Sequence, residues 1–381
     1  MSALWAGTWP EFDWLKRRFR DYAPNSYHAK MAGKPLAGRS ANNSYIGVLW
    51  KIKGDLDFWA DDLDLPRHNV SKPCALCAAE SSCTSTIPWD DLSEGAAWVS
   101  QTYSNAQWRL LFPLAHLIFS CQPGIGIWTM SADYMHDKHL GFDQYFLSSV
   151  LVLLCFYMLP GTPAQNLVQV WGDISAFYTS DEGKAFAKKA YGNLRLTMFC
   201  NPEDVNASFP KLKGRAAEIS VLTCALNSIF PRYIVRGNKL HRAVKIALNN
   251  SSTLEQILMD NKQEDALPLG VDHTFKTAIF DMLAAYKICA AEAIACVPPR
   301  RLFNITVKSH YLCHIALTCQ WLNPRLGWCY GGEDLMHRLK ILAASCCRAR
   351  SIYKVFEKMN EKYLWGLHYE YTRERLRIRC G

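Results

Sequence analysis

Hydrophobic positions in the first 160 residues follow two kinds of pattern. Residues 44–58, SYIGVLWKIKGDLDF, mix β-branched and aromatic residues with glycine near both ends, which predicts one or two strands. Residues 94–119 carry large apolar side chains at helical spacing, which predicts a helix. Residues 123–136 then predict a short strand that ends at Asp133, and the apolar run after Gly141 predicts a core helix.

The second half of the chain is predominantly helical in its pattern. Residues 160–300 read as helices with breaks at Gly161, Pro202, Pro210 and Pro231 and a polar hinge at 261–265. From 301 onward we expect a histidine-containing apolar helix, a turn at 324–327 and a long amphipathic helix from Glu333. In the tail, Arg373, Arg375, Arg377 and Arg379 alternate, so a strand there would have one basic face; a solvated edge strand explains the alternation equally well.

These patterns predict a mixed, helix-rich α/β fold. We divide it into an N-terminal extension (1–43), a first core part (44–160) with a small cysteine-containing insertion at about 66–92, a helical insertion (161–300), and a last core part with a basic tail (301–381).

Composition narrows the class of protein. A chain of 381 residues that is 50% hydrophobic and 12% aromatic is expected to fold around a substantial core. Its net charge of +9 favours a polyanionic partner such as nucleic acid, although a basic surface without such a partner is the alternative. The longest apolar run, 145–159, falls short of the roughly 20 residues of a spanning helix, so we expect a buried helix and no membrane. The 15 cysteines are spread over a large chain without a signal-peptide pattern, which favours reduced thiols and an intracellular protein.

Cys74 and Cys77 form a CxxC pair in the segment PCALC. Together with His68 and Cys83 they would supply a tetrahedral N/S ligand set, which predicts a structural Zn²⁺ that holds the small insertion together. Redox chemistry and unrelated thiols are the alternatives.

Two histidine-containing segments are ambiguous. In DYMHDKHLG, Asp133, His136, Asp137 and His139 could bind a metal or form an ordinary surface cluster. His310 and His314 have i, i+4 spacing but lack the glutamate of a zinc protease, so hydrogen-bonded core histidines are the simpler interpretation.

Three acidic residues stand at the edges of apolar stretches far apart in the sequence: Asp55, Asp133 and Glu333. Two divalent cations about 3.5–4 Å apart need shared carboxylates, which usually come from distant segments. Glu333 follows two glycines and opens a helix, where it would also serve as a simple N-terminal charge.

The order of several motifs resembles a transposon-derived family abundant in dinoflagellate genomes, itself similar to DDE transposases of the CACTA and Plavaka type. The matching stretches are GDLDFWADDLDLP, PCALC, PWDDL, ADYMHDKHLG, FPKLKGRAAEI, KSHYLCHIA, NPRLGWCY and GEDLMHRLK. The resemblance covers roughly residues 45–370, and we do not expect the short, aromatic, Pro/Gly-punctuated segment before Asn42 to form an end-binding module.

That resemblance implies an RNase H-like core with Asp55, Asp133 and Glu333 as catalytic metal ligands for Mg²⁺ or Mn²⁺, with Glu218 as the competitor for the third position. It implies two-metal phosphoryl transfer on DNA, a nuclear location and a capacity for homo-oligomerisation. Basic residues would neutralise phosphates: Lys211, Lys213, Arg215, Arg338 and Lys340. A catalytically inactive DNA-binding derivative and a helical, zinc-stabilised interaction protein are the alternatives.

Overall fold

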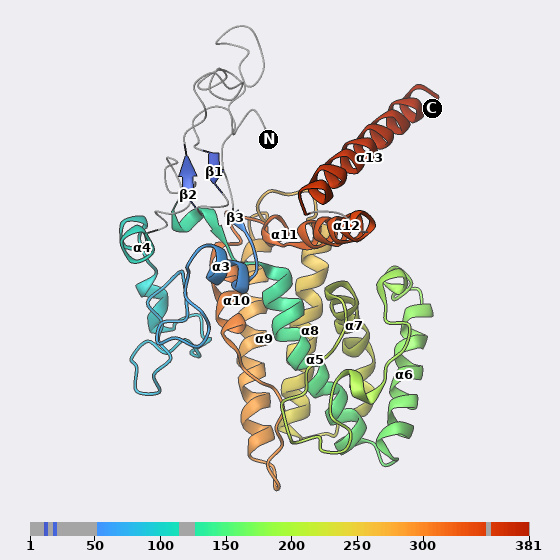
Figure 1. Ribbon diagram of the computed structural model, residues 1–381. Helices are drawn as coiled ribbons and strands as arrows, with labels where there is room; N and C mark the ends of the chain where they lie inside the picture. Colours follow the sequence, from blue (N-terminus) through green and yellow to red (C-terminus); the bar gives the residue numbers. More distant parts are fainter. Residues whose placement is uncertain (1–10, 14–17, 21–51, 114–125, 348–351, 381) are drawn as a thin grey trace, which may run out of the picture. The chain divides into compact units, whose positions relative to one another are not determined.

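The computed structural model describes residues 11–13, 18–20, 52–113, 126–347 and 352–380 (Figure 1). The chain forms two compact units, Met1–Trp328 and Cys329–Gly381. The division therefore follows Trp328, and the histidine-containing helix belongs to the larger unit.

Two small sheets lie in the described residues. β1 (Glu11–Asp13) and β2 (Arg18–Arg20) are antiparallel, and β3 (Ile52–Lys53) and β4 (Met130–Ser131) are parallel. Of the strand predicted to end at Asp133, β4 is the part that the structure confirms; it ends at Ser131 and follows a 3₁₀ turn. Of the strands predicted over 44–58, β3 is the described part, and residues 44–51 lie outside the described residues. Leu56 onward is helical, because Asp55 caps a helix there.

The segment after β3 is short-helical and irregular. α3 (Leu56–Asp62) is followed by a long irregular stretch, a 3₁₀ turn η2 (Ala97–Gln101) and α4 (Asn105–Leu111). The helix predicted over 94–119 is thus two short pieces, since Ser104 caps a new helix with a capping box to Gln107. Residues 114–119 lie outside the described residues.

A continuous helix, Met135–Met158, runs through the larger unit. It begins as a π-helix, η5 (Met135–Phe142), continues as α5 (Asp143–Val152) and ends as a second π-helical stretch, η6 (Leu153–Met158). By length and composition it could cross a membrane, but 72% of its apolar window is buried inside the protein. This is the core helix that the apolar run after Gly141 predicts.

Helices also dominate the rest of the larger unit, as the pattern of 160–300 predicts. They are α6 (Pro163–Thr179), α7 (Ala216–Ile229), α8 (Lys239–Asp260), α9 (Val271–Ile294), α10 (Val307–Thr318) and the single turn α11 (Pro324–Gly327). Short 3₁₀ turns are η4 (Ile127–Thr129), η7 (Ala187–Lys189), η8 (Leu196–Met198) and η9 (Phe230–Tyr233). α8 packs along α9, and α10 packs on both α9 and η5. Their buried faces join the helix Met135–Met158 in one hydrophobic core.

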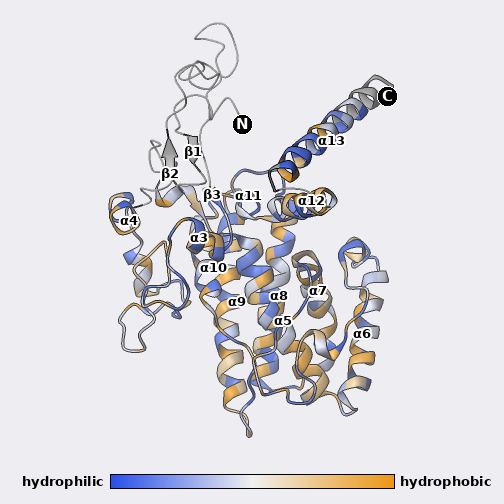
Figure 2. Ribbon diagram, viewed as in Figure 1, coloured by the Kyte–Doolittle hydropathy of each residue, from blue (hydrophilic) through white to orange (hydrophobic). Residues whose placement is uncertain are grey.

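The smaller unit consists of α12 (Tyr330–Cys346) and α13 (Ile352–Cys380). α12 is the amphipathic helix predicted from Glu333. The strand considered for the arginine-rich tail is wrong, because α13 continues through these residues for 29 residues in all. Alternating arginines are compatible with either conformation, and a helix needs no partner strand for its backbone hydrogen bonds. Figure 2 shows α13 as largely hydrophilic.

Candidate functional site

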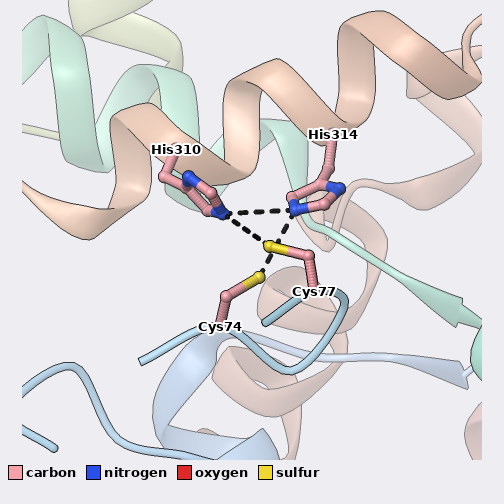
Figure 3. Close-up of side chains that lie close together, drawn as sticks. All are labelled: Cys74, Cys77, His310 and His314. Atoms are coloured by element: carbon pink, nitrogen blue, oxygen red, sulfur yellow. Dashed lines mark hydrogen bonds between the residues drawn. The ribbon is translucent and has the colours of Figure 1, made fainter. Parts of the chain in front are cut away.

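Two cysteines and two histidines from distant parts of the larger unit meet in its interior (Figure 3). Cys74 and Cys77 lie on the irregular stretch after α3, and His310 and His314 lie one turn apart on α10. All four residues are buried, and their ligand atoms lie within 4.8 Å of one another. They form a buried site that could hold a metal ion.

The spacing of the donor atoms fits a tetrahedral zinc ion. Sγ of Cys74 is 3.4 Å from Nε2 of His314, Sγ of Cys77 is 3.3 Å from Nε2 of His310, and the two Nε2 atoms are 3.2 Å apart. Zinc bonds of about 2.3 Å to sulfur and about 2.0 Å to nitrogen at tetrahedral angles place S and N about 3.5 Å apart and two N atoms about 3.3 Å apart. The protein thus holds three donor pairs at the separations that zinc requires.

Neighbouring groups orient the two histidines and favour the neutral form of His314. The Nδ1 atom of His310 lies 2.9 Å from the carbonyl oxygen of Trp89, to which it donates in the tautomer that leaves Nε2 as a lone-pair donor. Trp98 covers both imidazoles, with ring centroids 4.3 Å from His310 and 4.9 Å from His314. Burial lowers the pKa of His314, which favours the neutral imidazole that a metal needs.

The two thiols ionise unequally. Burial opposes ionisation of Cys74, but a hydrogen bond from Cys77 and the fields of His314 and His310 outweigh it, so the pKa of Cys74 is well below its usual range. The pKa of Cys77 is raised, because its thiol donates to Cys74 and is itself buried. Cys74 therefore ionises more readily than Cys77, and a bound cation would have to displace the proton of Cys77.

The predicted local ligand set requires correction. The structure brings Cys74 and Cys77 together with His310 and His314, whereas His68 and Cys83 are exposed and belong to none of the candidate metal clusters among the described residues. The physical reason is that α10 packs over the CxxC loop, where the Tyr311 hydroxyl accepts from the Ala75 amide (2.9 Å). α4 also holds the loop, since the Trp108 indole donates to the Ala75 carbonyl (2.9 Å). The simpler interpretation of His310 and His314 as core histidines is correct about their burial. It did not include their contacts with Cys74 and Cys77.

Asp55 and Asp133 occupy equivalent positions after two paired strands. In the parallel pair Lys53 is opposite Ser131, and each aspartate follows two residues later. Neighbouring strands lie about 4.8 Å apart, so the register directs these residues to the same edge of the sheet. His136 links them, since its Nδ1 bonds to Oδ2 of Asp133 and its Nε2 lies 3.9 Å from Oδ2 of Asp55.

Each aspartate also stabilises the helix that follows it. Oδ1 of Asp55 accepts from the Phe58 amide at 2.7 Å as the N-cap of α3, and Oδ1 of Asp133 accepts from the Met135 amide at 2.9 Å. The side chain of Asp55 is partly exposed, whereas Asp133 is buried. The backbone of both aspartates is therefore held by the helices, and solvent reaches the pair at Asp55.

Asp137 is buried one helical turn beyond Asp133. Neither of its carboxylate oxygens has a hydrogen-bond partner among the described residues. Burial raises its pKa well above the usual range, and the nearby charges of Asp133 and Asp55 act in the same direction while Lys308 opposes them. This carboxyl is thus biased toward its neutral form.

A third polar cluster is held together by an ammonium group. Lys138 donates to both oxygens of Asp143 and to the Ser251 hydroxyl, each at 2.7 Å, and lies 3.9 Å from Glu255. His139 contacts Glu255 at 2.9 Å. The carboxylates could bind a metal by spacing alone, but Lys138 already supplies the positive charge between them. The cluster is an ion network that joins η5 and α5 to α8.

The other predicted site residues stand in separate contexts. Glu218 is three residues into α7 and accepts from the Arg215 amide at 2.7 Å, a helix-capping role. Glu333 lies in the first turn of α12 in the smaller unit. All five basic residues, Lys211, Lys213, Arg215, Arg338 and Lys340, are exposed. Glu333 as a third metal ligand and a common basic face stay predictions.

Comparison of the chain with protein-family models found no match, and the comparisons with curated proteins and with solved structures found none either.

Proposed function

We propose that Cys74, Cys77, His310 and His314 bind a structural Zn²⁺. The observation that carries the proposal is the convergence of two sulfur and two imidazole nitrogen atoms within 4.8 Å of one another in a buried site. A Cys₂His₂ set is a closed zinc shell with no position for substrate, so the ion would act on the fold rather than on a reactant. It would tie the irregular stretch after α3, which has little regular backbone hydrogen bonding, to α10.

Cobalt substitution tests this proposal. Co²⁺ bound by two thiolates gives an intense sulfur-to-metal absorption band, and titration with Zn²⁺ should abolish it. Cys77→Ser should weaken binding strongly, and the matched control Cys83→Ser should leave the spectrum and the affinity unchanged. His314→Ala and His68→Ala form a second matched pair. Loss of the band in Cys83→Ser with retention in Cys77→Ser would contradict the assignment.

For the activity of the chain, we propose metal-dependent phosphoryl transfer on DNA, with Asp55 and Asp133 as ligands of Mg²⁺ or Mn²⁺. The supporting observation is that the two aspartates follow opposite residues of adjacent parallel strands and are linked by His136. This arrangement is the one expected of an RNase H-like core, and shared carboxylates are what two-metal phosphoryl transfer requires. The net charge of +9 is consistent with a polyanionic substrate, and DNA as substrate would place the protein in the nucleus.

A cleavage assay with radiolabelled DNA and Mg²⁺ or Mn²⁺ tests the activity. Asp133→Asn keeps the shape of the side chain and its hydrogen bond from Met135 but removes the charge, and should reduce cleavage by about 10²-fold or more. Asp57→Asn, on the exposed side of α3, is the matched control and should cleave like the parent. Equal cleavage by parent and Asp133→Asn would overturn the proposal.

The same samples separate the activity from the two alternatives. A catalytically inactive DNA-binding protein would retard DNA in gels without nicking it, with an affinity that falls steeply as salt is raised. A zinc-stabilised interaction protein would bind Co²⁺ but neither retard nor cleave DNA.

A further inference from the structure

α10 contributes two residues to the Cys/His cluster and contacts the segments that follow the two aspartates. His310 and His314 supply half of the cluster, while Lys308 and Tyr311 of the same helix contact the two segments that follow Asp55 and Asp133. These four residues occupy two consecutive turns, so a shift of α10 would move both sets of contacts together.

Tyr311 connects α10 to the first turn of α3. Its ring packs edge-on against Trp59, with centroids 5.8 Å apart, and both side chains are almost completely buried. The Trp59 amide donates to the carbonyl oxygen of Asp55 at 3.0 Å. Because the Tyr311 hydroxyl also accepts from the amide of Ala75, between the two cysteines, one side chain touches both the CxxC loop and the helix that Asp55 caps.

Lys308 connects α10 to the π-helix η5, which follows Asp133. Its ammonium donates to the Leu140 carbonyl at 3.2 Å, and its aliphatic part lies directly over Gly141. A Cβ atom at Gly141 would come within 2.6 Å of Cδ of Lys308, so only glycine permits this close approach. Lys308 stands two residues before His310 on the same helix, so α10 contacts both the cluster and η5.

We infer that zinc in the Cys/His cluster fixes the relative positions of the α3 and η5 segments and thereby sets the separation of Asp55 and Asp133. His310 and His314 are then positioning residues for the aspartate pair. The inference rests on the proposed zinc binding and extends it to the proposed divalent-cation site. It predicts that zinc loss loosens two segments that contain no zinc ligand.

Hydrogen exchange on the full chain, with zinc and after removal of zinc by a chelator, measures this effect. Amides of residues 56–62 and 135–142 should exchange about tenfold faster or more without zinc, because local opening costs less when the anchoring contacts loosen. Amides of α6, which packs on α7, serve as the internal control and should change little. Restoring zinc should restore protection. Unchanged exchange in both segments, with Co²⁺ absorption proving that the site binds metal, would overturn the inference.

Lys308→Met supplies the matched variant, since it removes the bond to Leu140 and retains the apolar stem. It should bind Co²⁺ like the parent and keep the zinc effect on residues 56–62, but lose the zinc effect on residues 135–142. A variant in which both segments still respond to zinc would show that Lys308 does not carry the coupling.

Manganese binding separates the failure of this inference from failure of the proposed activity. With zinc bound, electron paramagnetic resonance should detect Mn²⁺ binding that Asp133→Asn abolishes, and zinc removal should weaken it about tenfold or more. Absence of Mn²⁺ binding in the zinc-bound parent would refute the activity, while the exchange experiment would still decide the coupling. Mn²⁺ binding that is insensitive to zinc would refute the coupling and leave the activity standing.

Discussion

Replacing Lys138 by methionine should destabilise the protein in a strongly pH-dependent way. Lys138 and Asp143 are both completely buried, and the ammonium donates to both carboxylate oxygens at 2.7 Å. Methionine keeps the length of the side chain but leaves Asp143 as a buried carboxylate without its counter-ion. Breaking such a pair from one side typically costs about 3–5 kcal/mol.

The structure also sets an upper limit to this cost, because Asp143 can take up a proton instead. Burial already raises the pKa of Asp143 above its ordinary value of 3.8, while Lys138 and His139 oppose that rise. Without Lys138 the folded state would hold a neutral Asp143, and each pH unit above 3.8 then costs about 1.4 kcal/mol relative to the unfolded chain. The limit is about 4 kcal/mol at pH 7 and about 2 kcal/mol at pH 5.

The sign of the pH dependence follows from proton binding. The folded variant binds a proton that the unfolded chain releases above pH 3.8, so stability falls as pH rises. Urea denaturation followed by circular dichroism at pH 5, 6 and 7 should show that the stability deficit of Lys138→Met relative to the parent grows as pH rises, by at most about 1.4 kcal/mol per pH unit because the pKa of Asp143 is already raised in the parent.

The double variant Lys138→Met/Asp143→Leu is the control. It removes both charges at once, so its stability should be close to that of the parent and its pH profile should be parallel to it. Parallel profiles for the parent and Lys138→Met, or a loss below about 1 kcal/mol at pH 7, would refute the assignment of Lys138 and Asp143 as a mutually dependent buried pair.

Three further predictions follow from other buried groups. Zinc binding should release protons, with the larger share from Cys77, whose pKa is raised, and affinity should weaken as pH falls; a pH-indicator dye during zinc titration, compared between the parent and Cys77→Ser, measures this. Asp137→Asn should stabilise the metal-free protein by an amount that grows as pH rises above 3.8, because the parent must keep an unbonded buried carboxyl neutral; equal effects at pH 5 and pH 7 in urea titrations would contradict this. Asn323→Leu should cost about 2–4 kcal/mol in the same assay, because the buried amide donates to the carbonyls of Asn261 and Glu264 and accepts from the Arg325 amide.

The metal cluster shows what local sequence patterns can and cannot predict. The CxxC spacing indicates half of the proposed ligand set, and the i, i+4 histidines are the other half. The halves are separated by 233 residues between Cys77 and His310 and by 240 between Cys74 and His314. A search confined to nearby donors selects His68 and Cys83, because a single sequence does not show which distant residues are close in space. The signal in the sequence was that it contains one pair of cysteines and one pair of histidines, each of which is half of a zinc ligand set.

For Asp55 and Asp133, the sequence predicts the position of each residue but not their proximity. Each aspartate could be placed at the end of an apolar strand-like stretch by local pattern alone. Their shared edge depends on β3 pairing with β4 in parallel, in the register Lys53 opposite Ser131. Strands of two residues carry too little periodicity to specify a partner about 80 residues away, so the pairing arises from the packing of the helices that follow them.

The segment Asp133–Asp143 explains why helical spacing alone misjudges this region. An α-helix would put Asp133, His136 and Asp137 on one face as a single cluster. In the structure η5 is a π-helix, and consecutive polar residues have different surroundings. His136 contacts the aspartate pair, the buried carboxyl of Asp137 has no hydrogen-bond partner among the described residues, and Lys138 bonds to Ser251 of α8. π-Helical turns are rare and frequently lie at functional sites. With this wide turn, one short segment contacts the aspartate pair, α10 and the ion network on α8. A substitution at Lys138 should therefore affect mainly stability, and one at His136 should affect mainly the proposed metal binding.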